Sequence, residues 1–115
     1  GIAEKSKLDE ASKEPSVDRL VAEVESIAQL KVDLYPNPFR ERVNLVINNP
    51  NEAHVTIAMF NLAGMRIMDI FEGALSADQS YGFAIAGQGL DSGIYMIVIN
   101  GVGDQRIVKR VMLKR

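Results

Sequence analysis

The triplet Asp91-Ser92-Gly93 is the one sequence in this chain with the pattern of a catalytic motif. Aspartic proteases carry Asp-Ser/Thr-Gly on two loops whose carboxyl groups share a proton, so a chain of 115 residues would need two copies to supply both loops. Such a loop follows a buried strand, whereas residues 86–90, with the sequence AGQGL, have the composition of a flexible link. Because Asp and Gly are also ordinary turn residues, we interpret the triplet as a turn. A dimeric aspartic protease stays a third hypothesis that rests on Asp91 alone.

The other chemistry-bearing residues do not form a catalytic, metal-binding or cofactor-binding pattern. His54 is the single histidine and stands at the start of a predicted strand, where we interpret it as a surface residue rather than a metal ligand or general base. The chain has no cysteine, which excludes disulfides, thiolate zinc sites and cysteine nucleophiles. Gly87, Gly89 and Gly93 do not have the spacing of a dinucleotide-binding loop, and no helix pattern follows them. The sequence therefore predicts a protein that is not an enzyme and holds no metal or cofactor.

The charge balance argues against nucleic acid as a partner. The formal net charge of the chain is −2. Residues 1–30 carry four basic and seven acidic side chains, and residues 31–115 carry nine basic and eight acidic ones, so the two parts have balances of −3 and +1. Neither part has the strongly positive surface that binding to phosphate backbones requires. No apolar run approaches the ~20 residues of a membrane-spanning helix, and no signal peptide is visible, so we expect no direct membrane insertion.

The first part of the chain differs in texture from the rest. Pro15-Ser16 supplies a break and a helix N-cap, and the residues that follow have apolar positions at i, i+3 and i+4 spacing, which predicts an amphipathic helix at about 17–29. A helix of this length needs a surface that covers its apolar face. Docking on the rest of the chain, pairing with a second copy and attachment to an upstream domain all stay open. Because the chain begins Gly-Ile-Ala, we expect it to be a piece of a larger protein.

From about residue 32 the hydrophobic period becomes two, which is typical of β-strands. The run 94–100, with the sequence IYMIVIN, is the most apolar and predicts a central strand. Strands spaced by ~10 residues indicate an all-β fold, an immunoglobulin-like antiparallel β-sandwich of about seven strands whose core is built from Val, Ile, Leu and Met. The predicted strands are 32–35, 42–48, 54–62, 65–71, 81–85, 94–100 and 106–113. Residues 72–80 are interpreted as a polar connection, and Ala63-Gly64 as a chain reversal.

The segment Leu34-Tyr35-Pro36-Asn37-Pro38-Phe39 marks the entry into this β domain. Both prolines fix φ and lack a backbone donor, so neither fits inside a central strand. Each also favours extended geometry at the residue before it. The sequence therefore predicts a stiff kink at a sheet edge, with Tyr35 and Phe39 as anchors on either side.

Four features in this order resemble the C-terminal sorting domain of the type IX secretion system of Bacteroidetes. They are the segment 34–39, Asn61-Leu62-Ala63-Gly64 after a long strand, 89–95 (GLDSGIY) before the strongest strand, and the basic final strand 108–115 (VKRVMLKR). The resemblance covers about 32–115. It implies a sandwich of the kind predicted above and divides the chain into a linker with the amphipathic helix, 1–31, and a sorting domain, 32–115.

The resemblance also implies a function. Such a domain is a non-catalytic signal that directs a larger passenger through the periplasm and across the outer membrane to the cell surface or medium. The implied partners are the outer-membrane shuttle and translocon proteins and a cysteine-peptidase sortase that cleaves upstream of Val32; a homodimer stays open. A partner would capture an exposed edge and chain end by strand addition or in a groove. The residues expected to carry recognition are Pro36, Asn37, Pro38, Gly93, Tyr95, Lys109 and Lys114, of which Gly93 and Tyr95 have a structural alternative.

Two readings of the basic residues near the end of the chain compete. Lys109, Arg110, Lys114 and Arg115 are typical of an edge strand that charge protects from aggregation. The resemblance favours a contact with the secretion machinery instead. For the whole domain, the alternative function is a generic adhesion or carbohydrate-binding sandwich. Such sites present clustered aromatic rings, whereas this chain has no Trp and three Tyr.

Overall fold

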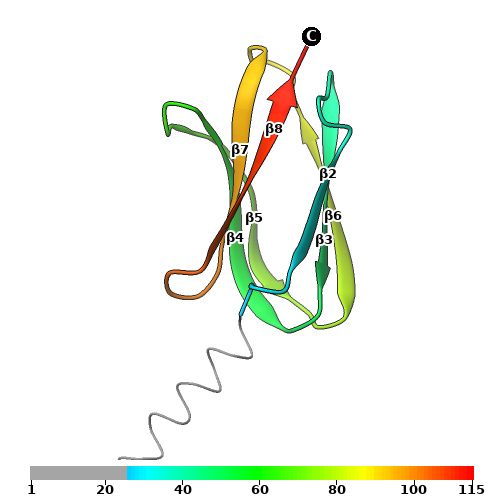
Figure 1. Cartoon of the computed structure of the whole chain (residues 1–115), viewed down its shortest axis with the longest axis vertical. Coiled ribbons are helices and arrows are strands. Elements are labelled where there is room, and N and C mark those ends of the chain that lie inside the picture. Colours follow the sequence, from blue (N-terminus) through cyan, green and yellow to red (C-terminus); the bar gives the residue numbers. More distant parts are fainter. Residues whose placement is uncertain (1–25) are drawn as a thin grey trace, which may run out of the picture.

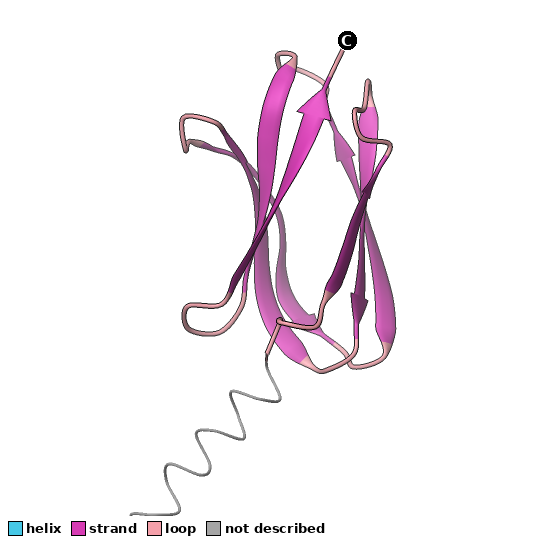
Figure 2. Ribbon diagram, in the orientation of Figure 1, coloured by secondary structure: helices cyan, strands magenta, loops and turns pink. Residues whose placement is uncertain are grey.

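The computed structural model describes residues 26–115, which form seven strands in two antiparallel sheets (Figures 1 and 2). The strands are β2 (Lys31–Tyr35), β3 (Arg42–Asn49), β4 (Ala53–Asn61), β5 (Arg66–Leu75), β6 (Gln79–Ala86), β7 (Gly93–Asn100) and β8 (Arg106–Leu113). The predicted all-β sandwich is confirmed, and all seven strands lie close to the predicted ranges. Most of the helix predicted at 17–29 lies outside the described residues, and its described part, 26–29, forms a turn rather than a helix.

The two sheets have different sizes and face each other as two layers (Figure 1). The smaller sheet has the strand order β2-β3-β6, and the larger has the order β5-β4-β7-β8. The strands β2 and β8 are each at an edge of their sheet. β7 lies between β4 and β8, as the prediction of a central strand at 94–100 requires.

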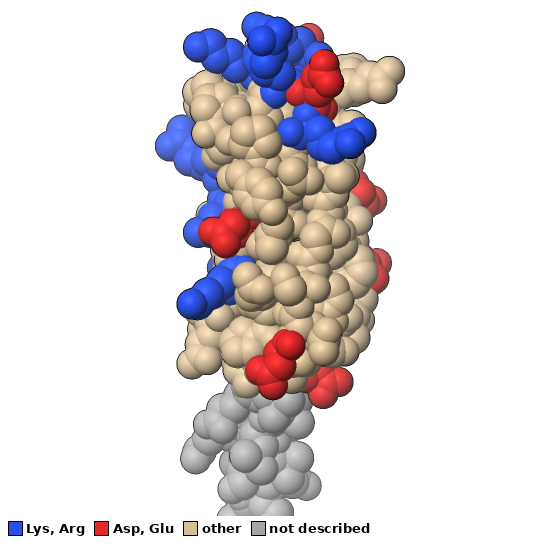
Figure 3. Space-filling model, turned by 90° about the vertical axis from the view of Figure 1, so that its right-hand side faces the viewer, with Lys and Arg blue, Asp and Glu red and all other residues tan. Residues whose placement is uncertain are grey.

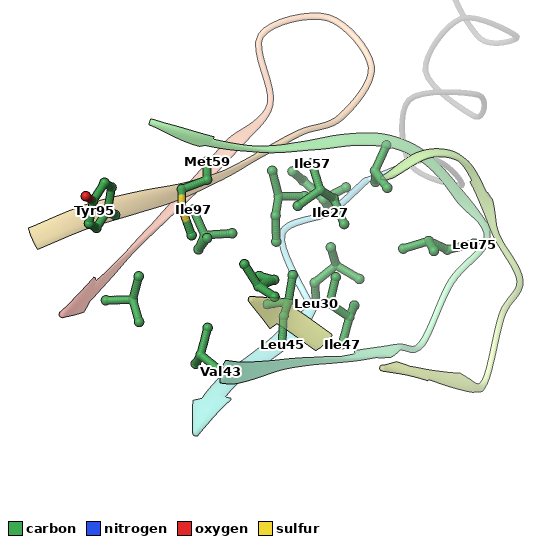
Figure 4. Packing of buried hydrophobic residues seen from close by; sticks show 14 of the residues in the cluster. Ile27, Leu30, Val43, Leu45, Ile47, Ile57, Met59, Leu75, Tyr95 and Ile97 are labelled. Atoms are coloured by element: carbon green, nitrogen blue, oxygen red, sulfur yellow. The ribbon is translucent and has the colours of Figure 1, made fainter. Parts of the chain in front are cut away.

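The core lies between the sheets because alternate residues of each strand point inward. In β3 the inward row is Val43, Leu45 and Ile47, and each is fully buried. In β7 the inward row is Tyr95, Ile97 and Ile99. Figure 4 shows Val43, Leu45 and Ile47 on one side of the core and Tyr95 and Ile97 on the other. The buried set is almost entirely aliphatic, as the composition predicted, and Phe39 and Tyr95 are its aromatic members.

One connection differs from the prediction. β5 runs to Leu75 and β6 begins at Gln79, so most of the segment interpreted as a polar connection is strand. β5 is an edge strand in which Arg66, Asp69 and Glu72 are exposed, which is why polar residues occur within it. The short crossover is held by Asn49, whose buried amide Nδ2 donates to the carbonyls of Leu75 at 3.2 Å and Ser76 at 3.1 Å.

Residues just before β2 belong to the same core. Ile27 and Leu30 are buried in it, and the N–H of Ile27 donates to Oε1 of Gln105 at 2.7 Å. This contact ties the start of the described chain to the turn between β7 and β8. Within 26–115, the structure contains no helix long and apolar enough to cross a membrane.

Candidate functional site at the end of the terminal strand

The segment Pro36–Phe39 lies along the outer edge of β8. Oδ1 of Asn37 accepts a hydrogen bond from the N–H of Met112 at 3.0 Å, and Nδ2 of Asn37 donates to the carbonyl of Arg110 at 3.1 Å. A side-chain amide offers the same donor and acceptor as a backbone peptide, so Asn37 pairs with β8 as a neighbouring strand would. The peptide bonds Tyr35–Pro36 and Asn37–Pro38 are both cis.

Phe39 continues this pairing with its backbone. Its N–H donates to the carbonyl of Met112 at 2.8 Å, and its carbonyl accepts from the N–H of Lys114 at 2.8 Å. The ring of Phe39 is 1% exposed, which confirms it as an anchor, whereas Tyr35 is 53% exposed and anchors nothing. We call the contacts of Asn37 and Phe39 with residues 110–114 the edge clasp. The edge clasp occupies the backbone hydrogen-bonding groups along the edge of β8 in the last third of that strand.

The loop between β6 and β7 packs against the edge clasp rather than forming the flexible link that its composition predicted. The N–H of Gly87 donates to the carbonyl of Glu41 at 2.9 Å. A Cβ atom at Gly87 would lie 2.9 Å from the Phe39 ring and 3.2 Å from Leu113. Gly87 is therefore a glycine because the loop backbone passes directly over these two side chains. Sequence reasoning missed this role, since the spacing of a glycine does not reveal what packs on it.

The same loop holds Arg115. Nε of Arg115 donates to the carbonyl of Leu90 at 3.1 Å, and its Nη2 donates to the carbonyls of Leu90 and Gly87. The backbone N–H of Arg115 donates to Oγ of Ser92 at 3.2 Å. The guanidinium thus joins the end of β8 to the β6–β7 loop, a contact that sequence reasoning did not identify.

Gly93 and Tyr95 support this end of the sandwich from β7. Gly93 pairs with Leu113 in the β7–β8 register and has a φ of 156°, a value that side-chain-bearing residues rarely adopt. Tyr95 is 7% exposed, and its hydroxyl donates to the carbonyl of Asp91 at 2.7 Å. Asp91 and Ser92 form an irregular segment with a bend at Ser92 that leads directly into β7, in keeping with the interpretation of Asp91-Ser92-Gly93 as an entry into the strand. Asp91 itself is exposed, and residues 26–115 contain no group of three His, Cys, Asp or Glu side chains able to hold a metal ion.

The two lysines predicted as recognition residues are both exposed but lie at different positions along the end of the chain. Lys114 follows β8 beside the edge clasp, whereas Lys109 pairs with Ile97 near the middle of the strand. Lys109 has the inward parity of Val111 and Leu113, yet it remains exposed because β8 is at the sheet edge. An inward-pointing charge at an edge disfavours the addition of another strand.

Basic side chains gather at the end of the sandwich where the chain terminates (Figure 3). Arg40, Lys114 and Arg115 line one hollow there together with Pro38 and Phe39. A second hollow, of about 610 Å³, is lined by two basic and two acidic side chains, those of Arg42, Arg115, Glu41 and Asp91. Of the seven predicted recognition residues, all except Lys109 lie at this end. The exposed ones among them are Pro36, Asn37, Pro38 and Lys114.

Comparison with known protein families identifies the family of this domain. A family model described as a secretion system C-terminal sorting domain matches residues 33–114. The matched range begins in β2 and ends just after β8, so it includes the edge clasp and the β6–β7 loop. No curated protein matches the chain.

Proposed function

The chain belongs to the family of type IX secretion C-terminal sorting domains, and on that premise we propose that its signal is the edge clasp together with the end of β8. Membership of this family implies export to the cell surface or the medium. We place the function in recognition by the export machinery rather than in catalysis. The surface that carries recognition would be formed by Pro36, Asn37, Pro38 and Lys114, with Lys109 further along the strand.

The observation that carries this proposal is the pairing of two distant segments. Asn37 in the opening segment and Met112 in the final strand are joined by a hydrogen bond, although they lie 75 residues apart in the sequence. The two segments therefore form one continuous surface. A partner that binds this surface contacts both ends of the domain at once. It therefore distinguishes a completed, folded domain from an unfinished chain.

The edge clasp also bears on how a partner binds. Strand addition requires free N–H and C=O groups along a sheet edge. At Arg110, Met112 and Lys114 these groups are already bonded to Asn37 and Phe39. Docking in a groove is therefore favoured over strand addition at this end. A hollow of about 210 Å³ beside Asn37, lined also by Ile94 and Met112, offers such a place.

Gly93 and Tyr95 take a supporting role in this proposal. Tyr95 is buried, and its hydroxyl bonds to a backbone carbonyl, so its contribution to export is to hold the turn at Asp91. Within the same proposal, the outer-membrane shuttle binds the domain, and a sortase cleaves the chain upstream of Val32.

The test is export of a fluorescent passenger fused to this chain in a Bacteroidetes host that has type IX secretion. The variant carries Lys109→Ala and Lys114→Ala, and the matched control carries Lys31→Ala, an exposed lysine at the start of β2. We expect the double variant to leave the passenger in the periplasm while the control exports normally, with both domains folded by circular dichroism. Normal export of the double variant would show that these lysines are not recognised.

A further inference from the structure

The residues just before β2 complete the hydrophobic core although they belong to neither sheet. Ile27 is 2% exposed and Leu30 is 9% exposed, and both are members of the same buried cluster as the inward rows of the strands. Figure 4 shows these two side chains among the core residues. The family model begins at residue 33, so the pair lies upstream of the matched range. We call residues 27–30 the core plug.

Hydrogen bonds hold the backbone of the core plug against the turn between β7 and β8. The N–H of Ile27 donates to Oε1 of Gln105 at 2.7 Å, and the N–H of Leu30 donates to the carbonyl of Ile27 at 3.1 Å. A Cβ atom at Gly101 would lie 3.0 Å from Cγ2 of Ile27, so this side chain packs directly on the backbone of that turn. The core plug is therefore part of the folded domain and not merely a connection to it.

Buried and hydrogen-bonded backbone is protected from proteases. A protease cleaves a bond when several residues on both sides of it enter its cleft as an extended chain, and such a segment must first leave the folded structure. Downstream of the core plug, β2 pairs with β3 along its whole length. Cleavage anywhere between residues 27 and 35 thus requires Ile27 and Leu30 to leave the core, and its rate follows the population of that open state.

We propose that the core plug determines where the passenger is separated from the domain: the cleaved bond lies before Ile27, and the plug stays with the domain. This inference rests on the proposed function, which includes a sortase that cleaves upstream of Val32, and it narrows that range. The carbonyl carbon of the broken C–N bond passes to the sortase thiolate and then to water or an acceptor amine. The nitrogen takes up protons and becomes the amino terminus of a domain whose core is complete.

Trypsin digestion of the full chain tests the protection, because Lys31 is an exposed basic residue within the protected segment. Mass spectrometry measures the rate of cleavage after Lys31. Gln105→Ala removes the acceptor of the Ile27 N–H without altering the digested sequence, and it should speed this cleavage about fivefold. The matched control is Asp104→Ala, at an exposed position in the same turn, which should leave the rate unchanged. Equal rates for the two variants would overturn the proposal.

Substitutions within the core plug give a second measurement of the same rate. Ile27→Ala should speed cleavage after Lys31 about tenfold or more, because it removes most of a buried side chain. Gln29→Ala, at an exposed position of the plug, should change the rate by less than about twofold. Circular dichroism first shows that each variant is folded. An unchanged chain that is cleaved after Lys31 as fast as Ile27→Ala would show that the plug protects nothing.

The position of the sortase bond is tested in the host that exports the fluorescent passenger. The domain is recovered after export, and its amino terminus is identified by mass spectrometry. We expect a domain that begins at or before Ile27, and one that begins after Ile27 would overturn the proposal. Absence of export would contradict the proposed function alone, whereas the trypsin rates would still decide whether the core plug protects the chain.

Discussion

Asn37 and Met112 are joined by a hydrogen bond from the Met112 N–H to Oδ1 of Asn37, although 75 residues separate them in the chain. Between two prolines that have no N–H, the side chain of Asn37 supplies both the donor and the acceptor that β8 needs at its edge. The opening segment of the domain and its final strand are thus one structural unit. This unit defines the surface that we propose the export machinery recognises.

Replacing Asn37 with alanine should destabilise the domain modestly. The change removes two partly solvent-exposed hydrogen bonds and leaves the N–H of Met112 and the carbonyl of Arg110 to water. We expect a loss of about 1 kcal/mol in the free energy of unfolding. Urea unfolding followed by circular dichroism measures it, with Asn51→Ala, in the turn between β3 and β4, as control. A loss no larger than that of Asn51→Ala would show that the edge clasp adds nothing to stability.

A methyl group at position 87 should be poorly tolerated. Gly87→Ala would place Cβ 2.9 Å from the Phe39 ring and 3.2 Å from Leu113, so the loop or the clasp must move. We expect destabilisation of about 1–3 kcal/mol, as for other insertions into well-packed sites.

The control for this substitution is Gly82→Ala in β6, where a Cβ would meet no atom within 4 Å. It should leave the urea midpoint unchanged or raise it slightly. Equal midpoints for the two alanine variants would contradict the close packing at Gly87.

Truncation of Ile97 tests the core. Its side chain is fully buried in the middle of β7, between strands on both sides. Ile97→Ala should cost about 2–5 kcal/mol and lower the melting temperature clearly, because it leaves a cavity that the sheets cannot fill. The comparison is Val108→Ala, on the outward row of the adjacent strand and 46% exposed. If the melting temperature of Ile97→Ala matched that of the unchanged chain, β7 would not be central to the core.

Much of the fold could be predicted because the strands and turns follow from patterns within short stretches of the sequence. The alternation in Arg42–Asn49 and Gly93–Asn100 places one row inward, and the turn at Gly64, with a φ of 86°, follows from glycine's tolerance of that conformation. The length of β5 was underestimated, because polar residues of this edge strand face solvent and have the composition of a connecting segment.

The candidate site could be predicted only in part. The sequence indicated that the segment 34–39 kinks at a sheet edge, but the strand that it pairs with depends on tertiary contacts that no local pattern specifies. For the same reason the packing of Gly87 and the contacts of Arg115 with Leu90 were not foreseen. Lys109 shows the converse. The alternation of residues along β8 places it on the inward row, yet its position on an edge strand leaves it exposed.

The most direct test of the central claim is the fraction of a fluorescent passenger that reaches the cell surface or medium when fused to the chain carrying Asn37→Ala, beside Asn51→Ala. Both variants are first shown to be folded at the growth temperature. If the edge clasp is the signal, Asn37→Ala leaves most of the passenger in the periplasm, while Asn51→Ala exports it as the unchanged chain does. Equal export by the two folded variants would contradict the account.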